Sequence, residues 1–177
     1  MRPDDPNYEY LLLIADALGD LRNDVIFVGG STAGLLLTDP VAASIRATKD
    51  VDAIVEAATL QQYYELENRL PAAGFVRDVN SDVICRWRHR ASGVLFDLMP
   101  IDPGILGFSN RWYPEAARTA VRVRLSARIE IRMIAAPGTS SPVTTWKTSS
   151  MSSTAVLRLS RSCGWPRPNC GSSCGNP

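Results

Sequence analysis

The segment Val25–Thr32 constrains the fold of this chain more than any other part of the sequence. The apolar run Val25–Val28 ends in two glycines, two hydroxyl residues follow, and a helix-like apolar stretch comes next. This order is typical of a strand, a tight turn and a helix N-terminus, where backbone N–H groups point outward and favour an anion such as a phosphate. We therefore expect Gly29, Gly30 and Ser31 to form a phosphate-binding turn.

Three acidic residues lie on two predicted strands downstream of this turn. Asp50 and Asp52 alternate with apolar residues, so both carboxylates face the same side of a strand. Asp97 is the one acid in the apolar run Val94–Leu98, where a lone carboxylate is costly unless it is paired or bound to metal. Hard oxygen ligands suit Mg²⁺, with Mn²⁺ as a substitute. The three acids together predict a site for two metal ions about 3.5–4 Å apart.

Each of these features also has a purely structural interpretation. The glycine turn could serve only to start a helix, with Ser31 or Thr32 as the N-cap. The paired acids could form a solvated strand face, and Asp97 could pair with an arginine of the segment Arg86–Arg90. That segment alternates basic and aromatic residues, so it could contact RNA or a triphosphate or form a solvated strand edge. The joint occurrence of the turn and the three acids favours an active site.

The glycine-serine turn, the paired acids and the third acid resemble the active-site pattern of the polymerase-β-like nucleotidyltransferase superfamily. The longer string, Val28–Ser31 followed by Arg-Ala-Thr-Lys-Asp-Val-Asp at residues 46–52, is similar to the AbiEii-type nucleotidyltransferases. These are toxins of abortive-infection and toxin–antitoxin systems. The resemblance covers about residues 8–136 and implies a minimal nucleotidyltransferase core.

The resemblance implies transfer of a nucleoside monophosphate from a nucleoside triphosphate to an acceptor hydroxyl. Asp50 and Asp52 would hold two Mg²⁺ ions, and Asp97 would complete the one that activates the attacking hydroxyl. The glycine turn would cradle the β- and γ-phosphates, and Arg46 would neutralise developing charge. The implied partners are an RNA acceptor, such as the 3′ end of tRNA, and an antitoxin protein. A small-molecule, antibiotic-modifying nucleotidyltransferase and a non-catalytic remnant remain as alternatives.

Composition and periodicity predict one α/β (α+β) domain over residues 1–137. With 45% hydrophobic and 21% charged residues, the composition is that of an ordinary globular protein. Helices are expected over residues 8–21, 32–37 and 60–70, and strands over residues 25–28, 51–55, 75–79, 83–88, 94–98, 121–125 and 129–134. This order predicts a mixed β-sheet with helices packed mainly on one side. No run of this sequence approaches the roughly 18 apolar residues of a membrane span. The N-terminus is acidic where a signal peptide is basic. We therefore expect a cytoplasmic protein without a membrane partner.

Residues 138–177 differ in character from the rest of the chain. They contain ten Ser, five Thr and three of the four Cys, whereas all 18 acids lie in residues 1–130. Such a segment cannot bury enough apolar surface to offset chain entropy, so we expect a low-complexity, disordered tail. If residues 143–148 are encoded by GC-rich codons, translation in the frame that starts at the third base of each codon gives a helix-like sequence. We hypothesise that a frameshift near Pro137 replaced and truncated a helical C-terminal half, which places the activity of this chain in question.

Overall fold

The computed structural model describes residues 5–36 and 45–135. The predicted domain boundary at residue 137, the tail over residues 138–177 and the frameshift hypothesis lie outside the described residues. No helix in the described part of the chain is both long and apolar enough to cross a bilayer.

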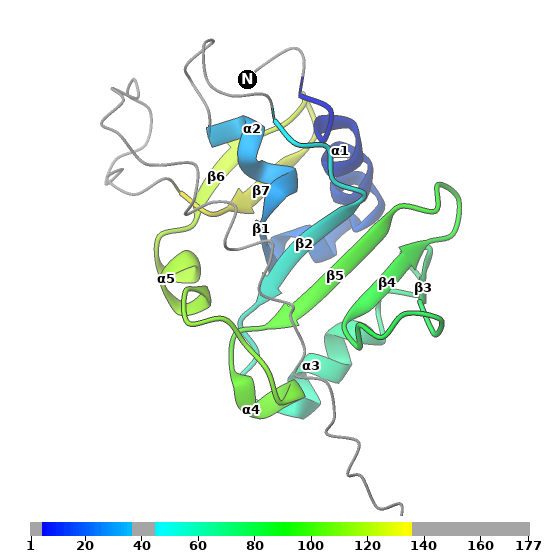
Figure 1. Cartoon of the computed structure of the whole chain (residues 1–177), viewed down its shortest axis with the longest axis vertical. Coiled ribbons are helices and arrows are strands. Elements are labelled where there is room, and N and C mark those ends of the chain that lie inside the picture. The colour runs from blue at the N-terminus through cyan, green and yellow to red at the C-terminus, as the bar shows by residue number, and fades with distance from the viewer. Residues whose placement is uncertain (1–4, 37–44, 136–177) are drawn as a thin grey trace, which may run out of the picture.

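The described residues form a seven-stranded mixed sheet in the order β3-β4-β5-β2-β1-β7-β6 (Figure 1). The strands are β1 (Val25–Val28), β2 (Asp50–Val55), β3 (Phe75–Arg77), β4 (Arg86–His89), β5 (Leu95–Pro100), β6 (Val121–Arg124) and β7 (Glu130–Met133). The pairs β2–β5 and β1–β7 are parallel, and the other neighbours are antiparallel. The sheet confirms the predicted mixed α/β class, and all seven expected strands are present.

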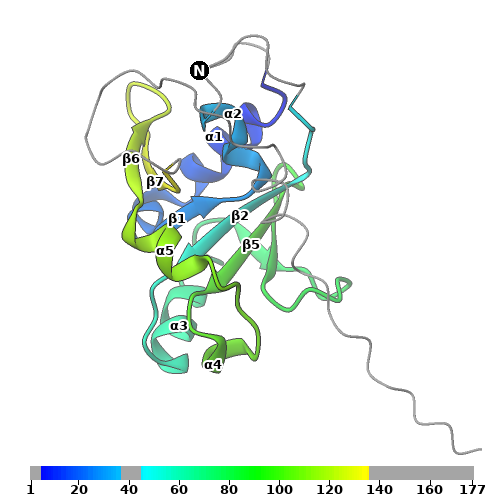
Figure 2. The same cartoon turned by 60° about the vertical axis from the view of Figure 1, so that its left-hand side comes forward.

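Helices lie on both faces of this sheet, with the longer ones on one face. The helices are α1 (Tyr8–Ala17), α2 (Ala33–Leu36), α3 (Leu60–Glu67), α4 (Pro103–Leu106) and α5 (Tyr113–Arg118). Buried side chains of α1 and α3 join the core on one face, whereas α5 packs on the opposite face against the strands (Figures 1 and 2). α4 and α5 were not expected, because four and six residues are too few to show helical periodicity.

Several expected elements differ from the structure at their ends, and one helix and one strand show the physical reason. The helix predicted over residues 8–21 ends at Ala17, because Gly19 adopts a positive φ of 55° and a 3-10 turn follows over Gly19–Asn23. The strand predicted from Val83 begins at Arg86, after a turn in which the Arg86 N–H donates to the Val83 carbonyl at 3.2 Å. Both shifts shorten an element without moving it in the sheet.

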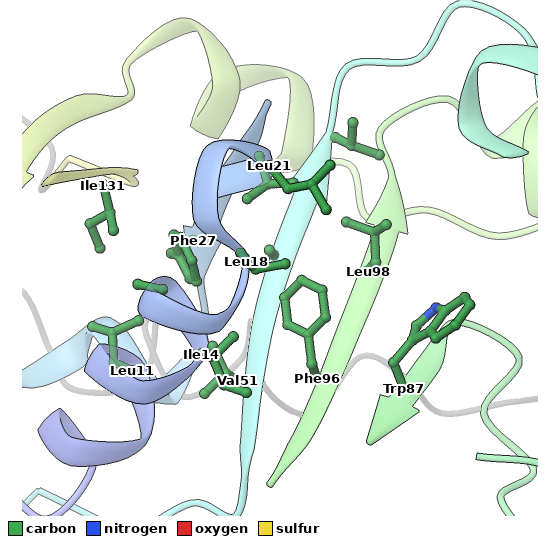
Figure 3. Close-up of a cluster of buried hydrophobic side chains, with 14 of the residues drawn as sticks. Leu11, Ile14, Leu18, Leu21, Phe27, Val51, Trp87, Phe96, Leu98 and Ile131 are labelled. Atoms are coloured by element: carbon green, nitrogen blue, oxygen red, sulfur yellow. The ribbon is translucent and has the colours of Figure 1, made fainter. Parts of the chain in front are cut away.

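The main core lies between α1 and the sheet (Figure 3). Leu11 and Ile14 of α1 are fully buried with Phe27, Val51 and Phe96 of the central strands. Full burial of each such side chain contributes about 1.5–3 kcal/mol. Because side chains alternate along a strand, a residue such as Val51 that faces this core leaves its neighbours on the opposite face. The core thus fixes the strands whose other face carries the acids.

Candidate functional site

The three predicted acids converge on the sheet face opposite α1. Asp50 and Asp52 belong to β2, and the parallel register places Asp52 directly beside Asp97 of β5. One carboxylate oxygen from each residue lies within 4.8 Å of the others. Like charges at adjacent positions of a sheet repel each other, so this arrangement requires a nearby cation or a bound proton.

The glycine turn lies against this cluster, at Asp52. The antiparallel register pairs Val28 with Asp52, so Gly29 follows directly at the end of β1. A Cβ atom on Gly29 would lie 2.3 Å from Oδ2 of Asp52, and Gly29 also has a φ of 79°. Glycine is therefore required here for both the space and the backbone conformation. The turn thus lies directly against the Asp52 carboxylate.

Arg86 of β4 supplies a positive charge inside the cluster. Its Nε donates to Oδ1 of Asp97 at 2.8 Å, and its Nη2 donates to Oδ2 of the same carboxylate at 2.7 Å. The same Nη2 lies 3.5 Å from Oδ2 of Asp50. Asp97 is almost completely buried, so an unpaired charge there would be costly. The structural interpretation of Asp97 as an arginine partner thus holds alongside its place in the acidic cluster.

Electrostatics distinguish Asp52 from its neighbours. Burial of the Asp52 carboxyl group, followed by the negative charges of Asp50 and Asp97, raises its pKa from 3.8 to about 8, although Arg86 acts in the opposite direction. The hydrogen bonds to Asp97 raise the pKa of Arg86 above its ordinary value, so this guanidinium stays charged. Asp52 therefore holds a proton at neutral pH unless another cation takes that place.

Asn7 joins the chain segments that surround the cluster. Its side-chain amide donates to the Arg46 carbonyl at 3.0 Å and to the Gly30 carbonyl at 3.4 Å, and its Oδ1 accepts from the Thr48 N–H at 2.8 Å. The Thr48 hydroxyl in turn donates to the Asp50 carboxylate. Sequence reasoning missed Asn7, because nothing in the sequence signals a contact between residues 41 positions apart. Thr48 belongs to the string over residues 46–52 that carries the family resemblance, but that string assigns it no role of its own.

The other predicted nucleotide-binding residues, Gly30, Ser31 and Arg46, differ in their exposure to solvent. Gly30 is partly exposed and begins a 3-10 turn over Gly30–Thr32. Ser31 is fully buried, and its hydroxyl lies 3.5 Å from the Val28 carbonyl, so its side chain faces the turn itself and not the surface. Arg46 is exposed. The structure thus brings the turn and the acids together and leaves the Arg46 side chain at the surface.

The donor set fits a divalent cation. Three carboxylates with oxygens this close offer the hard ligands that Mg²⁺ and Mn²⁺ prefer. Asp50 and Asp52 are partly exposed, whereas Asp97 is buried and already bound by Arg86. The two β2 carboxylates are therefore the more accessible ligands.

Comparison with known proteins shows a structural likeness to a nucleotidyltransferase-like protein. No protein family model matches the sequence, and no curated protein matches it. The crystal structure of an antigenic nucleotidyltransferase-like protein from Paracoccidioides brasiliensis is similar at 22% sequence identity and a TM-score of 0.43. The match covers 74% of this chain and 61% of that protein, so this chain spans about three fifths of its length. A TM-score below 0.5 does not establish a common fold, so the side chains of the site carry the functional proposal.

Proposed function

We propose that this chain is a nucleotidyltransferase that transfers a nucleoside monophosphate from a nucleoside triphosphate to an acceptor hydroxyl. The observation that carries the proposal is the convergence of Asp50, Asp52 and Asp97 next to the Gly29 turn. A structural role would be satisfied by one acid and Arg86, whereas Asp52 remains a half-buried acid beside two other carboxylates. Such a group is stabilised by a divalent cation.

In this proposal each residue has a distinct role. Asp50 and Asp52 would hold Mg²⁺, or Mn²⁺ in its place, which supplies charge stabilisation for the attacking oxygen and the leaving pyrophosphate. Asp97 would orient the cluster, and the sequence resemblance also assigns it to the metal. The backbone N–H groups of Gly30 and its neighbours would bind phosphate oxygens. Exposed Arg46 would approach the triphosphate from solvent.

The acceptor is proposed from the sequence resemblance to AbiEii-type proteins. That resemblance favours RNA, such as the 3′ end of tRNA, and a toxin that an antitoxin protein neutralises. A small molecule of the aminoglycoside class is the alternative acceptor, because the same metal chemistry serves both. Incubation with each of the four α-labelled nucleoside triphosphates, Mg²⁺ and either total RNA or an aminoglycoside separates the two.

Two variants test the chemistry in that assay. Asp52→Asn removes a proposed metal ligand and should abolish label transfer, whereas Asp82→Asn, an exposed acid in the loop before β4, should leave it unchanged. Transfer that continues at the wild-type rate in Asp52→Asn, or that persists in EDTA, would contradict the proposal.

One observation favours a second candidate function, a non-catalytic nucleotide-binding remnant. The bidentate Arg86–Asp97 pair engages both oxygens of the third acid. If the chain only binds, equilibrium dialysis with labelled ATP and Mg²⁺ should detect binding, while no label reaches any acceptor. Label transfer to RNA or to an aminoglycoside would exclude this candidate.

A further inference from the structure

We infer that Arg86 takes the place of a cation at Asp97 and limits the site to one divalent ion, held by Asp50 and Asp52. The inference rests on the proposed function, because it concerns the metal content of the same site. Arg86 is then a positioning residue, because it does not bind the metal itself but acts on it through Asp97 and Asp50.

The geometry of the Arg86–Asp97 pair is that of a fixed fork. Two different guanidinium nitrogens reach the two carboxylate oxygens, at 2.8 and 2.7 Å, which is the strongest arrangement that arginine forms with a carboxylate. The Asp97 side chain is 3% exposed and the Arg86 side chain 20% exposed, so water competes little for either group. A second metal ion could use Asp97 only by displacing this guanidinium.

Charge balance favours one ion over two. The three carboxylates carry three formal negative charges, and Arg86, within 3.5 Å of Asp50 as well as bound to Asp97, cancels one of them. One divalent ion neutralises the remainder. Two divalent ions would leave an excess of two positive charges in a partly buried site, where like charges repel strongly.

The strand register makes this arrangement specific to Arg86. Arg86 pairs directly with Asp97 across β4 and β5, whereas Arg88 on the same face pairs with Leu95 and is exposed. Arg88 carries the same charge on the same strand without a place in the cluster. It therefore provides the matched control.

Mn²⁺ binding to the full chain tests the inference without any substrate. In a titration of the free ion followed by electron paramagnetic resonance, the wild type and Arg88→Gln should each bind one Mn²⁺. Arg86→Gln frees both Asp97 oxygens, so it should gain a second ion or bind Mn²⁺ at least about tenfold more tightly. The double variant with Arg86→Gln and Asp97→Asn should return to one ion, because the gained ligand is absent.

Arg86→Lys covers the case in which Arg86→Gln does not fold. Lysine keeps the charge that buried Asp97 needs but cannot bind both oxygens as a fork, so Mn²⁺ should bind several-fold more tightly than to the wild type. The inference would be overturned if the wild type bound two Mn²⁺ ions, or if the wild type and the folded Arg86 variants bound Mn²⁺ equally. Either result would leave the proposed function standing. Absence of Mn²⁺ binding in every variant would overturn the proposed metal chemistry and the inference with it.

Discussion

Replacement of Asp52 by asparagine should stabilise the folded chain in metal-free buffer. The pKa of Asp52 is about 8 in the folded chain and 3.8 in the unfolded chain, so the folded state binds the proton more tightly. Stability therefore falls as the pH rises from 3.8 to about 8, because the carboxyl group must ionise beside two other acids. Asparagine is neutral throughout this window and avoids that loss.

The size of the gain follows from the pKa difference. Each pKa unit corresponds to 1.36 kcal/mol, so the full difference sets an upper bound of about 6 kcal/mol above pH 8. Asp52 is partly exposed, and solvent screening lowers this value, so we expect a gain of about 1–3 kcal/mol at pH 8. The gain should vanish below about pH 4, where Asp52 is protonated in both states.

Urea unfolding in EDTA at intervals between pH 4 and pH 8.5 measures this difference. The contributions of the other titratable groups are common to both proteins and largely cancel. Asp82→Asn is the control, because a substitution at this exposed loop acid should change the free energy of unfolding by less than about 0.5 kcal/mol. A difference between Asp52→Asn and the wild type that does not grow with pH, or an asparagine variant that is less stable at pH 8, would refute the electrostatic reasoning.

Three further predictions concern the surroundings of the cluster. Gly29→Ala places a Cβ onto the Asp52 carboxylate at a positive φ and should cost at least about 2 kcal/mol in urea unfolding, whereas Gly30→Ala, whose Cβ would meet only Thr48 at 3.7 Å, should cost less than about 1 kcal/mol. Asn7→Ala removes the hydrogen bonds that join α1 to the segments before β2 and should cost about 1–3 kcal/mol; an unchanged unfolding midpoint would contradict this. Mg²⁺ at 100 times its dissociation constant should stabilise the wild type by about 2.7 kcal/mol, and thermal unfolding should show no such gain in Asp52→Asn.

The strands and the facing of the acids could be predicted from the sequence. β1 and β5 are apolar runs, and the alternation of Asp50, Val51 and Asp52 places both acids on one face whatever the partner strands are. That Asp97 joins them depends on the parallel pairing of β2 with β5. The resemblance to nucleotidyltransferases grouped Asp97 with the other two acids, but the strand pairing itself comes from the structure, because periodicity alone does not say which strands are neighbours.

The contacts that define the site could not be predicted in the same way. Three arginines alternate over Arg86–Arg90, and only the register of β4 against β5 selects Arg86 as the partner of Asp97. Asn7 contacts residues 23 to 41 positions away, and its neighbours in the sequence give no sign of this. Long-range packing decides such contacts, whereas local sequence patterns decide the strands that carry them.

The strongest functional signal in the described residues is that the Asp52 carboxylate lacks the hydrogen-bonding partners that Asp50 and Asp97 have. Asp97 has Arg86, and Asp50 has Thr48 and a weaker contact with Arg86, but among residues 5–36 and 45–135 no side chain or N–H donates a hydrogen bond to the Asp52 carboxylate. The apolar core behind β2 supplies enough stability to hold such a group in place. A sheet that served only structure would be more stable with asparagine at this position. The cost is offset when a cation binds there, which is why a divalent ion at Asp50 and Asp52 accounts for the arrangement better than packing does.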